Sequence, residues 1–292
     1  MDRSDAEGSD AEGSHADGPR SPSAIARVEL PVATRARTGT TNAYLVGGLL
    51  VDPAARTDEL DAAVAERGTL PGERGGIEAI AVTHTHPDHV GAVADYAART
   101  GATVHAHADH VDRFRDATGV DPDATFRDGD AIGTTGVRAL DTPGHAPDHV
   151  AFAVENDATA DREPEPPAEA LVGDLAVAEG SVVVGAPEGD LREYLASLER
   201  VRDAGLDRLH PGHGPAIDDP VAACDRLIDH RLAREERVLA AVEAGADDVE
   251  TVLEAAYDKD LTGVEDLARA TVRAHLWKLA SEGRIDGRWS DG

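Results

Sequence analysis

Residues 81–91 read Ala-Val-Thr-His-Thr-His-Pro-Asp-His-Val-Gly, and this stretch points most directly to the fold. It continues an apolar run that is typical of a buried strand. Because alternate side chains of an extended chain point to the same side, His84 and His86 can hold one cation together. Asp88 and His89 fall at the start of the following helix, where they can reach a second cation. Two metal ions about 3.5–4 Å apart can share a bridging water and present hydroxide at neutral pH.

Three further residues of metal-binding types stand in turn-rich contexts at the ends of predicted strands. His145 lies in Thr-Pro-Gly-His, Asp174 in Val-Gly-Asp-Leu and His213 in Pro-Gly-His-Gly. We expect His145 to complete a three-histidine first site, Asp174 to bridge the two ions, and His213 to complete the second site. Imidazoles and carboxylates without thiolates suit two Zn²⁺ ions, and Mn²⁺ or Fe²⁺ also fit. The expected ligands are His84, His86, Asp88, His89, His145, Asp174 and His213.

These four motifs occur in the same order as in the metallo-β-lactamase superfamily of hydrolases, and the chain resembles that family in this respect. The resemblance covers roughly residues 25–218. It implies an α/β (α+β) fold, the αββα sandwich, with a dinuclear site at one edge of its two sheets. It also implies that a metal-bridging hydroxide attacks an ester, thioester or phosphodiester, while Asp88 and Asp174 hold and orient this nucleophile. The loop at 38–44 resembles the strand-turn that borders the pocket of the family.

The C-terminal part of the sequence is almost entirely helical in pattern. Predicted helices span 221–245, 247–257 and 264–283. An Asp-Gly turn within 284–292 predicts a small hairpin after them. Three helices and a hairpin match a winged-helix outline, so we place a winged-helix-like domain at 221–292, after a hydrolase domain at 24–220. Through His230-Arg231, Arg234-Glu235-Glu236 and the ending at 274–283, this tail resembles that of the lactamase-β-like protein 2 subgroup, which carries a winged helix and includes RNA-cleaving members.

Three functions fit these features. The leading one is a dinuclear-metal hydrolase of esters, thioesters or phosphodiesters, and the second is a single-stranded RNA endoribonuclease with the same fold. The third is a winged-helix nucleic-acid-binding or scaffold protein with a non-catalytic metal domain, and the complete ligand set argues against it. Residues 264–292 hold five basic and five acidic groups, a balance more typical of a solvated face than of an RNA-binding surface. The expected partner is a small-molecule or RNA substrate. A homodimer is a further expectation, because winged helices also serve as dimer modules.

A second copy of the His-x-His-x-Asp-His pattern occurs at 105–110. We favour the first copy as the metal-binding one, because Thr83, Pro87 and Gly91 also match the family pattern. The second copy lies on the next predicted strand, where the family usually has one histidine at an exposed end.

Other residues of reactive types stand alone in the sequence. His149 and His210 are either donors that hold a ligand in place or ordinary loop histidines. For His15, His230 and His275 we expect structural roles. The single cysteine, Cys224, excludes an internal disulfide and a cysteine-rich zinc module, and we expect it to be a small core residue.

The composition is strongly acidic, with 28 Lys+Arg against 57 Asp+Glu and a net charge of −29. Only Lys259 and Lys278 are lysines, whereas the other 26 basic residues are arginines. Such a charge repels nucleic acid phosphates at low salt. We hypothesise a halophilic protein, because dense surface carboxylate keeps a chain hydrated while salt screens its self-repulsion. An acidic protein from an ordinary cell is the alternative.

Two segments are too polar to join a core. Residues 1–23 begin with a repeat of Ser-Asp-Ala-Glu-Gly and predict a disordered acidic tail without the basic and apolar parts of a secretion signal. Residues 156–169 are acidic and Pro-rich and predict an exposed loop. No apolar run approaches the ~18 residues of a membrane helix, so the sequence predicts a cytoplasmic protein with no membrane partner.

Overall fold

The computed structural model describes residues 25–67, 76–154, 169–258 and 260–290. The predicted disordered tail at 1–23 lies outside these ranges, as does the predicted loop except for its last residue.

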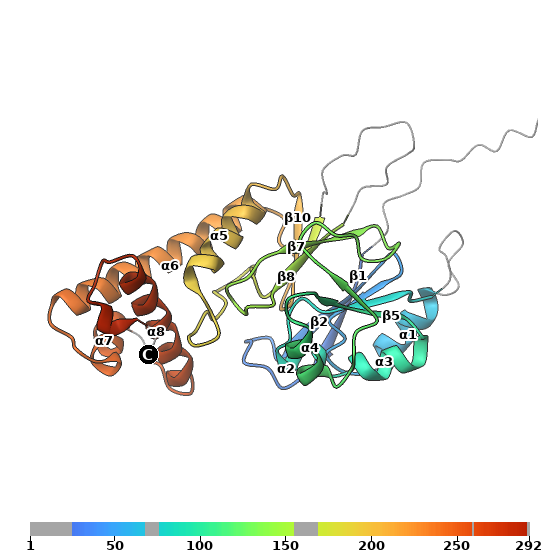
Figure 1. Cartoon of the computed structure of the whole chain (residues 1–292), viewed down its shortest axis with the longest axis horizontal. Helices are drawn as coiled ribbons and strands as arrows, with labels where there is room; N and C mark the ends of the chain where they lie inside the picture. The colour runs from blue at the N-terminus through green and yellow to red at the C-terminus, as the bar shows by residue number, and fades with distance from the viewer. Residues whose placement is uncertain (1–24, 68–75, 155–168, 259, 291–292) are drawn as a thin grey trace, which may run out of the picture.

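Two β-sheets form the centre of the molecule (Figure 1). The first has the strand order β1 (Ala26–Pro31), β2 (Thr40–Val46), β3 (Leu49–Val51), β4 (Ala79–Ala81), β5 (Thr103–His107) and β6 (Ala124–Phe126). The second has the order β10 (Arg208–Pro211), β9 (Glu169–Gly173), β8 (Val150–Val154) and β7 (Val137–Asp141). In the first sheet β1–β3 pair antiparallel and β3–β6 pair parallel. In the second sheet only β9 and β10 are parallel.

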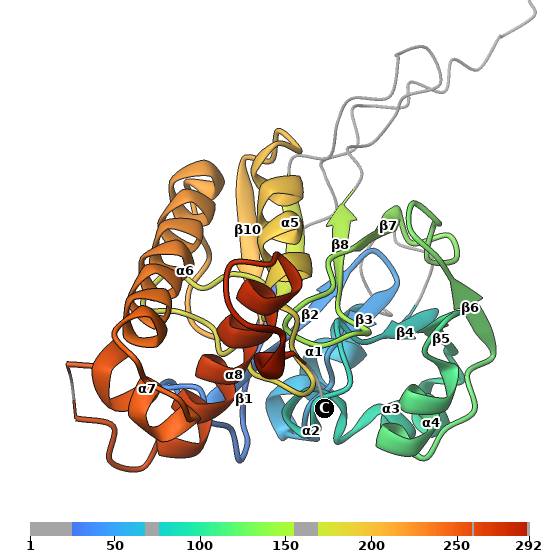
Figure 2. The same ribbon diagram turned by 60° about the vertical axis from the view of Figure 1, so that its left-hand side comes forward.

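Helices cover the outer faces of both sheets (Figure 2). Near the first sheet lie α1 (Asp58–Arg67), α2 (Pro87–Val90), α3 (Val93–Thr100) and α4 (Val111–Thr118), and α5 (Leu191–Arg202) and α6 (Pro220–Glu243) pack on the second. Strand β2 alternates, because Tyr44 and Val46 pack between the sheets whereas Ala43 and Leu45 pack toward the helices. This arrangement confirms the predicted αββα sandwich.

The tail contains the three predicted helices, α6, α7 (Val249–Ala256) and α8 (Glu265–Ser281). The first turns of α6 join the core of the second sheet through Cys224 and Leu227, whereas Val238 lies in the core of the tail itself. One continuous helix therefore connects the sandwich to the tail (Figure 1).

The hairpin predicted at 284–292 is wrong for the part of it that the structure describes, which ends at residue 290. Gly287–Trp289 form a 3₁₀ helix instead. The Asp286 side chain accepts a hydrogen bond from the backbone N–H of Arg288, and this local bond closes a turn without any strand pairing. Trp289 packs against the core of the tail. A wing is therefore not formed by these residues.

No helix among the described residues combines the length and the apolar character that a membrane crossing requires.

Candidate metal centre

The seven predicted ligands lie beyond the carboxyl ends of four strands. His84 follows β4 of the first sheet, and His145 follows β7 of the second. Asp174 comes directly after β9, and His213 comes after β10. Strands β7, β9 and β10 run in the same direction, because β8 is antiparallel to β7 and β9 and because β10 is parallel to β9. Their carboxyl ends therefore meet at one edge, which explains why residues so far apart in sequence converge.

Three histidines form the first group of donors. The Nδ1 atom of His86 lies 2.9 Å from Nε2 of His84 and 3.0 Å from Nε2 of His145. Ligand nitrogens of a tetrahedral zinc site are separated by about 3.3 Å, given Zn–N distances of about 2.0–2.1 Å. Both measured separations lie within about 0.4 Å of this value, and all three donor atoms lie within 4.8 Å of one another.

Asp88, His89 and His213 form the second group, with one donor atom of each within 4.8 Å of the others. His213 Nε2 lies 3.7 Å from an Asp88 carboxylate oxygen.

Asp174 lies between the two groups. Its Oδ1 atom is 3.6 Å from His89 Nε2 and 3.3 Å from His213 Nε2, which belong to the second group. Its Oδ2 atom is 3.7 Å from His145 Nε2 in the first group. One carboxylate oxygen therefore faces each group, which is the arrangement that a bridging ligand requires.

The remaining ring nitrogen of each of the five histidines has a partner outside the cluster. These partners are Thr83 Oγ1 for His84, Glu188 for His86, Asp52 for His89, the Val183 carbonyl for His145 and the Thr40 carbonyl for His213. Such contacts fix the ring orientation and the tautomer of a metal-binding histidine.

The donor set fits divalent cations. Nε2 of His89 is fully buried and, among the described residues, neither it nor Oδ1 of Asp174 has a hydrogen-bond partner. Unsatisfied buried polar atoms are rare and call for an explanation. A cation bound to His89 Nε2 and Asp174 Oδ1 would explain why both atoms lack a hydrogen bond. A site of imidazoles and carboxylates suits zinc and related ions.

The protonation states of the histidines favour cation binding by the first group of donors. Burial lowers the pKa of His84 and of His145, so both rings are neutral, as a metal ligand must be. Burial also lowers the pKa of His89, but the Asp52 carboxylate outweighs it and raises this pKa to about 9. For Asp174, burial raises the pKa, and the contacts with His213 and His89 outweigh it, so the pKa is lowered. A cation in the second group would replace the proton on His89.

Asp52 is a residue of the candidate site that the sequence analysis missed. It is 1% exposed, and its carboxylate accepts hydrogen bonds from the backbone N–H of Thr83 (2.6 Å), from Thr83 Oγ1 (2.8 Å) and from His89 Nδ1 (2.9 Å). It also has a positive φ of 51°, which is uncommon for a residue other than glycine. The signal in the sequence was an acid directly after a buried strand, at the same sheet edge as His84.

Glu188 and Arg113 were also missed, and Glu188 contacts His86 of the first group. A Glu188 oxygen is 3.2 Å from His86 Nε2, and Arg113 donates a hydrogen bond to the other oxygen of Glu188. The contacts with His86 and Arg113 lower the pKa of Glu188 to about 2, against the effect of burial. Arg113 also donates to Asp148 at 2.9 Å. Arg113 therefore holds a carboxylate that orients one of the proposed ligands.

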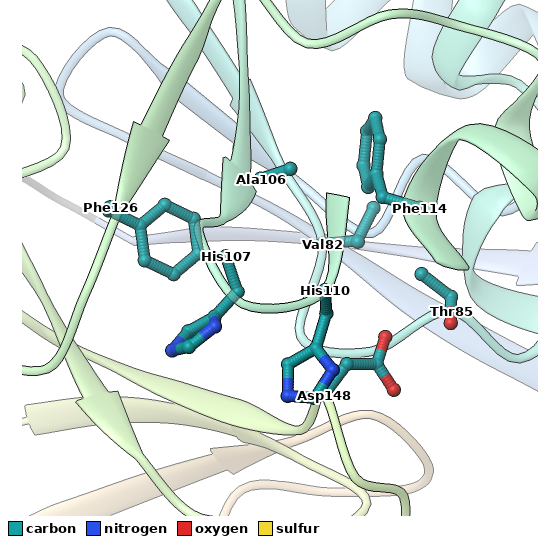
Figure 3. A pocket seen from close by; sticks show the side chains of 8 residues that line it. All are labelled: Val82, Thr85, Ala106, His107, His110, Phe114, Phe126 and Asp148. Atoms are coloured by element: carbon teal, nitrogen blue, oxygen red, sulfur yellow. The ribbon is translucent and has the colours of Figure 1, made fainter. Parts of the chain in front are cut away.

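The second His-x-His-x-Asp-His copy is used differently. His107 Nε2 lies 3.2 Å from Asp141, and Asp109 forms an ion pair with Arg127. His107 and His110 line a small cavity beside Asp148 with room for about one water molecule (Figure 3). Within the described residues, no member of this copy joins a group of three metal-binding donors. That the first copy is the metal-binding one stays a prediction.

His149 and His210 have different surroundings. His149 donates from Nδ1 to the Thr142 carbonyl (3.0 Å) and accepts at Nε2 from the backbone N–H of Asp174 (3.1 Å). Burial lowers the pKa of His149 to about 3, so this ring stays neutral and holds the Asp174 backbone in place. His210 instead contacts Glu169 at 2.5 Å on the neighbouring strand. Cys224 is buried in the core, as predicted.

Comparisons with known proteins place this site in context. Residues 36–160 match the family described as Metallo-beta-lactamase superfamily. A Drosophila melanogaster protein named beta-lactamase-like protein 2 homolog is 30% identical over 264 residues, which cover 84% of this chain and 84% of that protein.

Two further similarities extend over most of the chain. An atrochrysone carboxyl ACP thioesterase from Aspergillus chevalieri is 29% identical over 266 residues, covering 84% of this chain and 77% of that protein. The crystal structure of a metallo-beta-lactamase family protein from Thermus thermophilus is similar with a TM-score of 0.67 at 26% identity, covering 89% of this chain and 94% of that one.

Proposed function

Because the chain belongs to the metallo-β-lactamase superfamily of hydrolases, we propose that it hydrolyses thioesters and related acyl esters with two divalent metal ions. The observation that carries the proposal is the position of Asp174, with one oxygen toward each of two three-donor groups. Zinc is the metal we expect, and Mn²⁺ or Fe²⁺ would fit the same donors.

The bound ions would supply hydroxide at neutral pH and stabilise the negative charge that develops on the substrate carbonyl oxygen. The chain itself orients the attacking group. Asp88 and Asp174 have 18% and 13% of their side chains exposed, so both carboxylates border the open side of the cluster. They can accept a hydrogen bond from a water molecule there and hold it in place for attack.

The surroundings favour a small acyl substrate over RNA. Val183, whose carbonyl holds His145, is 37% exposed and offers an apolar contact beside the site. In the tail, Lys278 is paired with Glu235 and Glu282, and Arg284 is paired with Glu235. Cations that are already neutralised bind phosphates weakly, and the net charge of −29 opposes RNA further. The thioesterase from Aspergillus chevalieri supports the same choice of substrate class.

A paired substrate panel tests this proposal. The purified chain, loaded in turn with Zn²⁺, Mn²⁺ and Fe²⁺, is assayed in multimolar KCl on acyl-pantetheine thioesters and on a fluorescent single-stranded RNA. We expect metal-dependent thioester hydrolysis that is lost in Asp88→Ala and retained in Asp112→Ala, a change at an exposed acid outside the cluster. Metal-dependent RNA cleavage without thioester turnover would contradict the proposal and assign a nuclease instead.

A further inference from the structure

The segment at 176–190 connects β9 to α5 and contacts two of the proposed ligands. The Val183 carbonyl accepts a hydrogen bond from His145 Nδ1 at 2.7 Å, and Glu188 lies 3.2 Å from His86 Nε2. Two of the three histidines in the first group therefore take their orientation from this one segment.

This connecting segment contains no strand or helix, and one backbone hydrogen bond within it runs from the N–H of Gly189 to the carbonyl of Gly185 at 2.8 Å. Helix α6 of the tail supplies part of the support. Arg226 donates to the carbonyls of Gly180 (2.5 Å) and Val177 (2.6 Å), and Arg231 donates to the carbonyl of Val182. Arg231 is only 3% exposed. Loss of this bond would leave a buried cationic donor without its partner, so the bond to the residue next to Val183 supports the segment.

Helix α8 supports the same segment further along. The backbone N–H of Ala186 donates to the carbonyl of Ala270 at 3.0 Å. At Gly185 the segment and helix α8 are so close that an added Cβ would lie 2.7 Å from the Cβ of Ala270. The approach of α8 therefore requires a glycine at this position, and α8 holds the segment between Val183 and Glu188.

We propose that α6 and α8 act as positioning elements of the metal centre: they hold the segment at 176–190 and thereby set the orientation of His86 and His145. The proposal rests on the proposed function, because it requires these histidines to bind a metal ion. It assigns the tail to the same catalytic unit as the sandwich. A nucleic-acid-binding domain attached to an independent hydrolase would have no need of these contacts.

The closeness of Gly185 and Ala270 provides the test. Gly185→Ala introduces the crowding, Ala270→Gly removes the opposing methyl group, and the double variant combines both changes. For each full-length protein, the affinity for Co²⁺ is measured by chelator competition, and the visible spectrum of the bound Co²⁺ reports its ligand geometry. These readouts do not depend on turnover, and circular dichroism verifies that each variant is folded.

We expect Gly185→Ala to weaken the binding of one Co²⁺ ion about 10-fold or more and to change its spectrum, as loss of an orienting contact does in other metal sites. The double variant should recover most of the affinity and the original spectrum. Arg231→Met should also weaken binding, whereas Arg35→Met should not. Arg35, on the loop between β1 and β2, forms an exposed ion pair with Asp266 of α8 and donates to the Gly263 carbonyl, away from the segment at 176–190.

Unchanged affinity and spectrum in a folded Gly185→Ala protein would overturn this inference alone. So would a double variant that stays as weak as Gly185→Ala, because the contact with Ala270 would then not be the cause. A wild-type chain that binds no Co²⁺ would overturn the proposed function, and this inference with it.

Discussion

Each of the five histidines proposed as ligands has one ring nitrogen in the cluster and the other on an outside partner. This double use separates them from His107, whose Nε2 contacts Asp141. The distinction is chemical rather than one of sequence pattern, because both His-x-His-x-Asp-His copies spell the same motif. Loss of such an orienting partner typically lowers the metal affinity of a site about 10–100-fold.

The two copies give a matched pair of variants. His86→Ala removes a donor of the first group and should abolish binding of at least one metal ion per chain. His107→Ala should leave the metal content unchanged, since its ring contacts Asp141. Elemental analysis of both purified variants after dialysis against zinc checks this expectation. Loss of metal in His107→Ala with retention in His86→Ala would reverse the assignment of the two motifs.

At this scale the sequence predicts the donors but not their partners. All seven predicted ligands meet in the structure. The sequence could predict them because each lies in a short motif that follows a strand. Asp52 and Glu188 could not be identified in the same way, since their roles depend on which side chains the two sheets bring together. The Val183 carbonyl is a backbone atom, which no residue type encodes.

Among the elements, the turn before His145 is held by close packing. Gly144 has a positive φ of 122°, and a Cβ there would collide with the backbone nitrogen of Tyr194 in α5. The backbone N–H of Asp190 also donates to the Gly144 carbonyl at 2.9 Å. Helix α5 thus fixes the turn that presents a proposed ligand.

Gly144→Ala should therefore destabilise the chain by about 3 kcal/mol or more, through a disfavoured φ together with the collision, and should weaken metal binding. Gly119→Ala is the control, because Gly119 also has a positive φ but no atom lies within 4 Å of its added Cβ. We expect the control to lower the free energy of unfolding by about 1 kcal/mol and to keep full metal content. Urea titrations of both variants measure the difference. Equal losses would show that the contact with α5 is unimportant.

Helix α8 contains a buried histidine whose titration affects stability. Burial lowers the pKa of His275 to about 4, although Glu235 nearby acts in the opposite direction. The unfolded chain takes up this proton near pH 6.5 and the folded chain only near pH 4. The contribution of the neutral His275 ring to the free energy of unfolding is therefore present above pH 6.5. It decreases as the pH falls from about 6.5 to about 4.

His275→Leu removes this contribution while it keeps an apolar side chain in the core. Between pH 6.5 and pH 5 the wild type should lose about 1.5 kcal/mol more unfolding free energy than the variant. Equilibrium unfolding of both proteins at the two pH values gives this difference directly. Parallel pH profiles would contradict the assignment of a neutral, buried ring to His275.

The three tail helices begin and end within two residues of their predicted ranges, because hydrophobic periodicity and turn residues agree there. Two further elements were not predicted, for local reasons. Helix α4 was not expected. Only Phe114 of its eight residues is buried, so its sequence shows no repeating apolar positions that would indicate a helix. At the C-terminal end, the side-chain bond from Asp286 replaces the expected hairpin with a 3₁₀ turn.

For the whole molecule, the acidic surface carries its own prediction. With a net charge of −29, the folded chain should be destabilised by self-repulsion at low salt and stabilised as salt screens it. We expect the thermal midpoint to rise steadily from low to multimolar KCl. Equal stability across this range would leave the acidic composition unrelated to salt and would contradict the halophile hypothesis.

The central claim for the whole molecule is that two metal ions act together between the two sheets. The measurement that tests it most directly is a titration of the metal-free chain with Zn²⁺, in which thioester hydrolysis is followed against equivalents of bound metal. The account predicts an inert metal-free protein and a rate that reaches its maximum only when two ions are bound per chain. Full activity at one bound ion, or in the metal-free protein, would contradict it.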